Sequence, residues 1–283
     1  MHRIRNAHEA PLSLAGDIED ITDYDYALVH MFDSPNIGER YFNFFKTQIG
    51  RGREVFLDNS IFELGESFSP GKFATYVETL RPTVYIVPDV LEDGPGTIES
   101  FAKFIHDHPD LPGVKMGVVQ GRDMEEVIEC YRYMAEHADY IAFSYDSALY
   151  SKPDMWTTDM PFGKNHQRAA GRFGIIRGLF AEGIIVTTKP HHLLGSSLDS
   201  EMKLHIDGGH FFIRSVDTSN PVWAGLNDLV CSKYLDGWGM VSDKPYDSSQ
   251  ILMCDHIEED LQVDVDTFHA TRSAIKTFRG MCK

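Results

Sequence analysis

The feature of the sequence that most constrains its fold is an alternation of short apolar runs with segments of helical periodicity. Seven runs, most of them rich in β-branched and aromatic residues, have the composition of strands that are buried on both faces. They cover residues 26–31, 54–60, 83–89, 115–121, 140–146, 191–195 and 210–217. Strands that alternate with helices form a parallel sheet with helical crossovers. The pattern therefore predicts an α/β fold.

The segments between the runs predict helices over 70–80, 96–107, 123–137 and about 165–186. The third segment places apolar side chains at helical spacing on one face: Met124, Val127, Ile128, Tyr131 and Met134. A further helix is expected over about 255–281. No eighth run is as clear as the other seven, and GWGMVSD at 237–243 is the candidate for it.

Both a doubly wound sheet and a closed (β/α)8 barrel fit this alternation. No Gly-rich phosphate-binding fingerprint follows the first run, which disfavours the dinucleotide-binding version of the open sheet. The length of 283 residues is close to the roughly 250 that such barrels use. No Pro/Gly/Ser-rich linker and no repeat divides the chain. We therefore expect a single (β/α)8 TIM-like barrel domain over residues 1–283.

Polar residues stand at the carboxyl ends of the runs. They are Asp58, Asp89, Gln120, Ser144 with Asp146, His192 with Gly195, and Asp217. Asp58, Asp89 and Gln120 follow one another at intervals of 31 residues, about one strand–helix unit. In a (β/α)8 barrel these positions converge on one rim, where active sites are built. Because each buried carboxylate must be desolvated at a cost, three that converge from different strands indicate a functional site.

Each aspartate taken alone could equally be a helix cap or a turn residue. As a set, they suit displacement at an anomeric carbon, with one carboxylate as nucleophile and another as acid/base. They also suit a Mg²⁺ or Zn²⁺ hydrolase. The sequence contains no H-x-H or H-E-x-x-H pattern, and the adjacent His191 and His192 would point to opposite faces of a strand. We therefore expect no metal site.

Composition and the first residues indicate where the protein works. The chain is 42% hydrophobic, as in a globular protein, and its first 25 residues lack the apolar stretch of a signal peptide. No run approaches 18 apolar residues. The four cysteines lie far apart, so we expect reduced thiols. These features predict a soluble, cytoplasmic protein that does not bind a membrane.

Five segments, taken in chain order, resemble those of the tRNA-guanine transglycosylases and their DNA-acting relatives, which insert 7-deazaguanines. LDNSIF (57–62) resembles the family's D-S-G-G-F/Y segment, and VPDVLED (87–93) resembles its base-recognising segment. GVVQGRDMEEV (117–127) is similar to G-[IV]-[VI]-Q-G-G, and KPHHLLGSS (189–197) to K-P-R-Y-L-M-G-V-G. RSVDTSNP (214–221) occupies the place of the nucleophile segment. The resemblance covers roughly residues 54–225.

The resemblance implies a pentosyltransferase that works without a cofactor or a metal. Asp217 would be the nucleophile and Asp58 the general acid/base. The residues implied to bind the base are Phe62, Asp89, Gln120, Ser144, Tyr145 and Gly195, with the Phe62 ring stacking on it. Asp217 would attack C1′ of a flipped-out deoxyguanosine, guanine would leave, and a 7-deazaguanine such as preQ0 would replace it.

Three departures from the family bear on the substrate. Asn59, Ser60 and Ile61 replace the Gly pair after the first Asp, and the segment after Asp146 lacks the Gly-rich pattern of the base pocket. The zinc-binding cysteine cluster with which the tRNA enzymes dock tRNA is also absent from the sequence. A short, zinc-free member resembles the DNA-acting branch found in some bacteriophages and bacterial modification islands. We therefore expect DNA as the partner rather than tRNA, and a homodimer is compatible with the resemblance.

Other function classes stay open beside this interpretation. The chain could be a tRNA-guanine transglycosylase, or an unrelated barrel hydrolase or glycosidase that acts on a nucleoside or sugar. A non-catalytic accessory subunit is a further class, and the presence of Asp217 argues against it.

The formal net charge of −17 by itself argues against a protein that coats nucleic acid. Residues 164–192 nevertheless carry a local net charge of +4, which leaves −21 for the rest of the chain. We expect four cations of this segment to contact the nucleic-acid backbone beside the site: Lys164, Arg168, Arg172 and Lys189. A basic segment can equally be a solvated helix face. As an interface, it predicts a small, salt-sensitive footprint.

Overall fold

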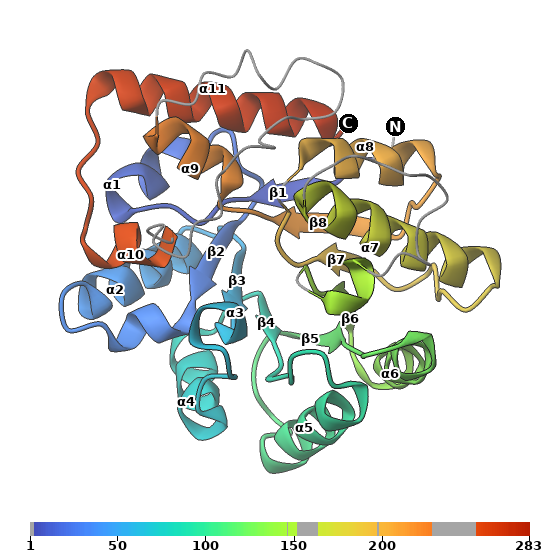
Figure 1. Cartoon of the computed structure of the whole chain (residues 1–283). Helices are drawn as coiled ribbons and strands as arrows, with labels where there is room; N and C mark the ends of the chain where they lie inside the picture. The colour runs from blue at the N-terminus through green and yellow to red at the C-terminus, as the bar shows by residue number, and fades with distance from the viewer. Residues whose placement is uncertain (1–2, 146, 152–163, 197, 228–252) are drawn as a thin grey trace.

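Eight parallel strands form a nearly closed (β/α)8 TIM-like barrel, which confirms the predicted fold class. The computed structural model describes residues 3–145, 147–151, 164–196, 198–227 and 253–283. Figure 1 looks onto the strands, which lie in the centre with the helices around them. The strands are β1 (Arg5–Ala7), β2 (Asp25–Leu28), β3 (Val55–Asp58), β4 (Val84–Ile86), β5 (Val114–Val119), β6 (Tyr140–Phe143), β7 (His191–Leu193) and β8 (Ile213–Asp217). Their order in the sheet is β1-β8-β7-β6-β5-β4-β3-β2.

All seven predicted strands are confirmed, but the eighth is not where the sequence suggested. It is β1, which pairs in parallel with β8, and the candidate at 237–243 lies outside the described residues. β1 has three residues, of which Arg5 and Asn6 are polar, so it carries no apolar run. On the open side of the barrel, the Asp23 backbone N–H donates to the carbonyl of Asn6 at 2.8 Å. This contact links β1 to the start of β2.

The helices surround the strands and connect their ends. They are α1 (Leu12–Ala15), η1 (Gly16–Ile18), η2 (Val29–Asp33), α2 (Gly38–Gly50), α3 (Ile61–Leu64), α4 (Pro70–Leu80), α5 (Gly94–Asp107), α6 (Met124–His137), η3 (Ala148–Ser151), α7 (Lys164–Ala181), α8 (Asp199–Asp207), α9 (Asn220–Leu226), α10 (Met253–Glu258) and α11 (Val265–Met281). The predicted helices over 70–80, 96–107, 123–137 and about 165–186 correspond to α4, α5, α6 and α7.

The prediction of one helix over 255–281 is wrong, because the chain forms α10 and α11 there. Asp260 between them has a φ of 53°, which a right-handed helix does not allow. Asp264 then caps α11 by accepting a hydrogen bond from the Thr267 backbone N–H at 2.8 Å. The chain therefore forms two separate helices here in place of one continuous helix.

Aromatic rings fill the inside of the barrel below the carboxyl ends of the strands. The rings of Tyr24 and Phe56 lie 4.2 Å apart between centroids, and Phe56 is 5.9 Å from His192. Tyr26 stacks on His192 at 6.3 Å. Because side chains two residues apart in a strand share a face, Asp58 faces inward above Phe56. These rings fill the barrel interior directly beneath the carboxyl ends of the strands.

Two further findings concern the chain as a whole. No helix of the described residues is long and apolar enough to cross a membrane. Cys130, Cys254 and Cys282 are free thiols, as expected, while Cys231 lies outside the described residues.

Candidate functional site at the carboxyl rim of the barrel

The polar residues singled out in the sequence lie at the carboxyl ends of adjacent parallel strands, on one rim of the barrel. Asp58 ends β3 and Asp217 ends β8, while Asp89, Gln120, Ser144 and Gly195 follow β4, β5, β6 and β7. The positional part of the prediction therefore holds for these residues, while Asp146 lies outside the described residues. The chemistry of each residue depends on its neighbours.

Asp58 lies half-buried at the inner side of the rim. The Tyr26 hydroxyl donates to its Oδ2, and the Ser60 backbone N–H donates to its Oδ1. Burial raises the pKa of Asp58 well above its usual value, and the negative charges of Glu63 and Asp217 add to this effect, against the two hydrogen bonds. The surroundings therefore favour a protonated carboxyl that can donate a proton.

Asp217 has donors of a different kind. Its Oδ1 lies 2.8 Å from Nε2 of His192, and the Gly195 backbone N–H donates to both carboxylate oxygens at 3.1 and 3.2 Å. Nδ1 of His192 lies 2.8 Å from the Ser215 Oγ, which is bonded to the Tyr140 hydroxyl. A histidine with its proton on Nε2 satisfies this chain, because Ser215 then donates to Nδ1. The arrangement orients Asp217 as an acceptor.

Glu63 is a fourth carboxyl at this rim, beside Asp58, Asp89 and Asp217, and the sequence reasoning missed it. It lies in α3, five residues after Asp58, and no donor among the described residues reaches its buried Oε2 atom. Burial, together with the negative charge of Asp217, raises the pKa of Glu63 to about 7. The sequence feature that could have identified Glu63 is its position in the short helix that follows Asp58. This helical turn brings the Glu63 side chain back toward the end of β3.

The segment between Asp58 and Glu63 is strained. Ser60 has a φ of 59°, in the left-handed region that a non-glycine residue seldom adopts. A glycine would adopt this conformation at little cost, whereas a serine is held in it against a preference for negative φ.

Asp89 and Gln120, predicted from the 31-residue spacing, touch each other. Nε2 of Gln120 donates to Oδ2 of Asp89 at 2.8 Å, and Nδ2 of Asn59 donates to Oδ1 at 2.8 Å. Burial raises the pKa of Asp89, against these two hydrogen bonds. Gln120 also accepts a hydrogen bond from the Glu92 backbone N–H at 3.1 Å. Asn59, also missed, completes a buried group that presents amide donors around one carboxylate.

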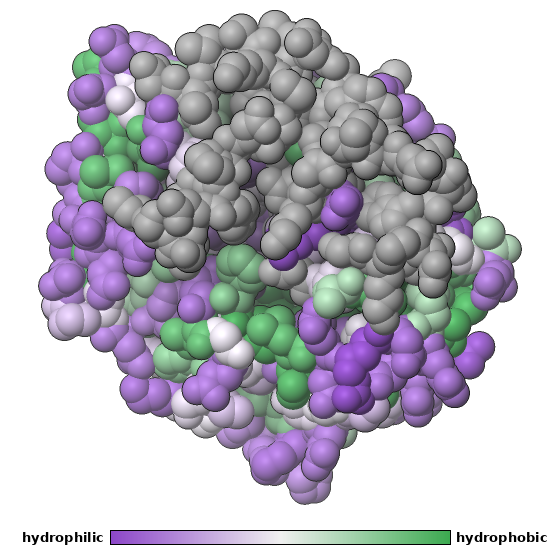
Figure 2. All heavy atoms as spheres, viewed as in Figure 1, coloured by the Kyte–Doolittle hydropathy of each residue, from purple (hydrophilic) through white to green (hydrophobic). Residues whose placement is uncertain are grey.

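Apolar side chains are exposed beside this group. Phe62 and Leu64 of α3 are 48% and 45% exposed, and Val90 after β4 is 39% exposed. Figure 2 shows an apolar area over α3 and the end of β4, bordered by hydrophilic residues. An exposed aromatic ring next to buried polar groups is typical of a site that binds a flat ring by stacking.

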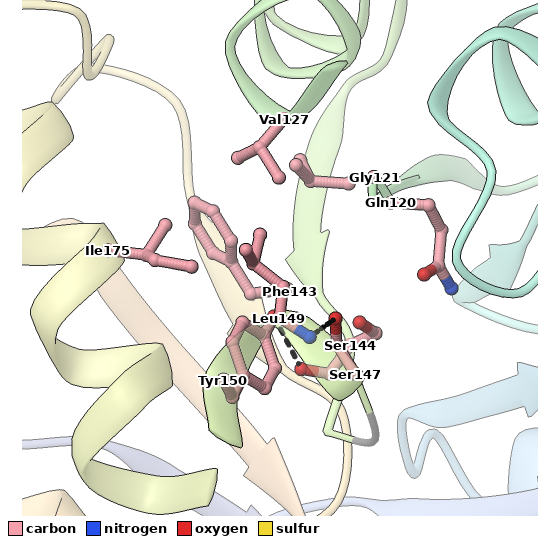
Figure 3. Close-up of a pocket in the computed structure, with 10 residues that line it drawn as sticks. Gln120, Gly121, Val127, Phe143, Ser144, Ser147, Leu149, Tyr150 and Ile175 are labelled. Carbon is pink, nitrogen blue, oxygen red and sulfur yellow. Dashed lines mark hydrogen bonds between the residues drawn. The ribbon is translucent and has the colours of Figure 1, made fainter. Parts of the chain in front are cut away.

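The predicted base-binding residues Ser144 and Tyr145 lie toward η3 and α7. Ser144 and Gln120 line a small cavity of about 10 Å³, far below the roughly 300–1,000 Å³ of ligand pockets. In Figure 3 the Gln120 side chain points away from the apolar residues of this cavity, in keeping with its bond to Asp89. The end of the Gln120 side chain that contacts Asp89 therefore lies outside this cavity.

Two of the four predicted nucleic-acid contacts are wrong. Arg172 is 0% exposed and forms an ion pair of 2.7 Å with the buried Glu201, so it cannot reach a phosphate. Lys189 precedes β7, and its Nζ donates to the carbonyl of Ala138, which precedes β6, at 2.6 Å. Both Lys189 and Ala138 therefore lie at the amino ends of strands, on the rim opposite the site.

Of the other two cations, the structure describes the side chain of Arg168 but not that of Lys164. The Arg168 guanidinium lies 5.6 Å from the centroid of the Tyr145 ring, which follows β6, and so stands near the carboxyl rim. Lys164 is the first residue of α7, and its side chain lies outside what the structure describes. The predicted contact with a nucleic-acid backbone remains a prediction for both.

The histidines take separate places, and the opposed directions predicted for His191 and His192 are confirmed. His191 faces the helices, with Nε2 2.9 Å from the Tyr131 hydroxyl, whereas His192 faces Asp217 inside the barrel. In the described part of the chain, no group of three or more His, Cys, Asp or Glu side chains could hold a metal ion.

The arrangement can therefore support nucleophilic displacement by one inward-facing carboxylate, with a proton supplied by a second inward-facing carboxyl. A (β/α)8 barrel hosts many reactions, so the fold identifies none of them. No protein-family model matches the chain, and no curated protein matches it.

Proposed function

We propose that the chain is a DNA base-exchange enzyme, which replaces guanine by a 7-deazaguanine through a covalent bond between Asp217 and C1′ of the deoxyribose. The observation that carries the proposal is the pair formed by Asp58 and Asp217. Their charges interact across the rim, and their surroundings differ. Burial and the neighbouring negative charges favour the proton on Asp58, while Asp217 accepts hydrogen bonds from His192 and Gly195. Such a difference separates an acid from a nucleophile.

The first half of the reaction uses both groups at once. An oxygen of Asp217 attacks C1′ of a nucleotide that has been flipped out of the duplex, and the bond between C1′ and N9 breaks. Its electron pair goes to N9, which receives the proton of Asp58. Guanine leaves as a neutral base, and the sugar stays on Asp217 as an ester.

The second half reverses these steps with a different base. The Asp58 carboxylate takes the N9 proton of the incoming 7-deazaguanine as N9 attacks C1′. Asp217 leaves as a carboxylate, and Asp58 is again protonated. Protons balance over the cycle, and no electrons are lost or gained.

The group around Asp89 supports recognition of a guanine-like base. Guanine and 7-deazaguanine carry N–H donors on N1 and on the 2-amino group. The carboxylate of Asp89, which Asn59 and Gln120 hold by hydrogen bonds, is a suitable acceptor for these donors. The exposed ring of Phe62 lies close by in α3 and can stack on the base. DNA is the proposed carrier because the sequence lacks the zinc-binding cluster of the tRNA enzymes.

The test is incorporation of labelled base. Duplex DNA is incubated with the protein and with labelled guanine or labelled preQ0, and a parallel reaction contains tRNA. Label should enter DNA with the wild type and with Asp25→Asn, whose buried carboxyl lies at the opposite rim beside Arg53. It should not enter DNA with Asp217→Asn.

Three results would contradict the proposal. Release of guanine without incorporation of any base would identify a hydrolase of the glycosidase type. Label that enters tRNA and not DNA would identify a tRNA-guanine transglycosylase. Incorporation that persists in Asp217→Asn would show that Asp217 is not the nucleophile.

A further inference from the structure

Arg172, predicted from sequence to contact DNA, has every guanidinium N–H engaged inside the protein. Nε and Nη2 bond the two carboxylate oxygens of Glu201 at 2.7 and 2.8 Å. Nη2 also donates to the carbonyl of Gly195 at 2.8 Å, and Nη1 to that of Leu194 at 2.7 Å. The remaining Nη1 hydrogen points to the carbonyl of Ser144 at 3.3 Å. One side chain of α7 thus joins the ends of β6 and β7 to α8.

The bond to Leu194 matters because its carbonyl and the Gly195 N–H belong to one peptide group. In a trans peptide the C=O and the N–H point in opposite directions. Arg172 holds the oxygen end of this group, and the N–H end donates to both oxygens of Asp217 at 3.1 and 3.2 Å. A cation on the oxygen also polarises the peptide and strengthens the hydrogen bond at the other end.

The peptide group needs such a hold because the backbone here is not regular. Gly195 has a φ of 60°, and a Cβ atom at this position would lie 3.1 Å from Cβ of Tyr145. A glycine can also adopt other conformations at little cost. Rotation of the peptide would turn the Leu194 carbonyl toward Asp217, where two oxygens would face each other.

We infer that Arg172 is a positioning residue, which locks the Leu194–Gly195 peptide with its N–H on Asp217 and so orients this carboxylate for attack on C1′. Glu201 neutralises the buried guanidinium and fixes its plane, because the pair is bidentate. The inference rests on the proposed function only in that Asp217 is taken as the nucleophile. The position of the peptide itself can be measured without any activity.

The test compares Arg172→Lys with Arg53→Lys. A lysine keeps the charge beside Glu201, but its three donors cannot hold two carboxylate oxygens and three carbonyls. Arg53 is a matched control because it pairs with Asp25 at 2.7 Å at the opposite rim. Amide NMR spectra and hydrogen exchange are recorded for both variants and the wild type, and base-exchange rates are measured in the same preparations.

In Arg172→Lys the Gly195 amide proton should shift upfield and its hydrogen exchange should accelerate by about tenfold or more, while Arg53→Lys leaves both unchanged. The kcat of base exchange should fall about 100-fold with an unchanged KM for the free base, because a misplaced nucleophile affects the transition state and not base binding. An unchanged Gly195 amide in a folded Arg172→Lys protein would overturn the inference.

The wild type provides a second measurement that needs no variant. If the peptide is locked, the Gly195 amide exchanges as slowly as those of β8, even if Arg172→Lys does not fold. Fast exchange of this amide would overturn the inference. If the NMR results are as expected but the wild type exchanges no base, the proposed function fails while the lock on the Leu194–Gly195 peptide stands.

Discussion

Nε2 of His192 lies 2.8 Å from Oδ1 of Asp217, and both side chains are buried inside the barrel. The two residues come from neighbouring strands, β7 and β8, and the ring of His192 also stacks on Tyr26, whose hydroxyl donates to Asp58. The two carboxyls of the proposed reaction are therefore tied to one imidazole, one through a hydrogen bond and the other through a stacked ring.

Replacement of His192 should impair the reaction more than the fold. His192→Leu removes a donor from Asp217 and should lower kcat for base exchange by about 10²–10³-fold. It leaves the buried Ser215 hydroxyl without its acceptor, at a cost of about 1–3 kcal/mol in the free energy of unfolding. Initial rates and urea unfolding measure the two effects. His192→Gln keeps an N–H donor and should lose less of each, and equal losses in both variants would contradict the assignment.

The pH dependence of guanine release should move in opposite directions in two variants. Glu63→Gln removes a negative charge that raises the pKa of Asp58, whereas Tyr26→Phe removes a hydrogen bond that lowers it. Release needs a protonated Asp58, so its rate falls as pH rises through that pKa. The falling limb should therefore shift to lower pH in Glu63→Gln and to higher pH in Tyr26→Phe. Shifts of the same sign in single-turnover pH profiles would refute Asp58 as the acid.

Stability should depend on pH through Glu63. Its pKa is raised from 4.5 to about 7, so between these values the folded protein holds more protons than the unfolded chain. The stability that this group contributes is full below about pH 4.5 and is lost as pH rises toward 7. In Glu63→Gln the loss of unfolding free energy between pH 5 and 8 should be smaller by about 2 kcal/mol. Urea unfolding at both pH values measures this, and the exposed Glu125→Gln should behave as the wild type.

Asn59 should be required for the stability of the group around Asp89. Asn59→Ala leaves Oδ1 of Asp89 buried without its donor, which should cost about 1–3 kcal/mol. Asn43 in α2 is exposed, so Asn43→Ala should stay within about 0.5 kcal/mol of the wild type. Chemical denaturation of the two variants gives the comparison. If both lose the same stability, the bond between Asn59 and Asp89 carries no net energy.

The rim itself could be read from the sequence because it depends on the period of the chain. Apolar strands that alternate with helices form a parallel barrel, and all their carboxyl ends meet at one rim, so Asp58, Asp89 and Gln120 were placed before any contact was known. β1 could not be predicted in this way. It consists of only the three residues Arg5–Ala7, and its pairing with β8 is made by backbone hydrogen bonds, so its side chains show no strand pattern.

What the sequence by itself determined is the α/β barrel and the strand ends on which its polar residues lie. Only the tertiary structure decided their partners. Arg172 and Lys189 count as free cations in a linear charge sum, yet one neutralises Glu201 in the interior and the other lies at the opposite rim. Likewise, Glu63 differs from an exposed glutamate only through burial beside Asp217. The period of a chain is local, whereas burial and charge pairing depend on residues far apart in sequence.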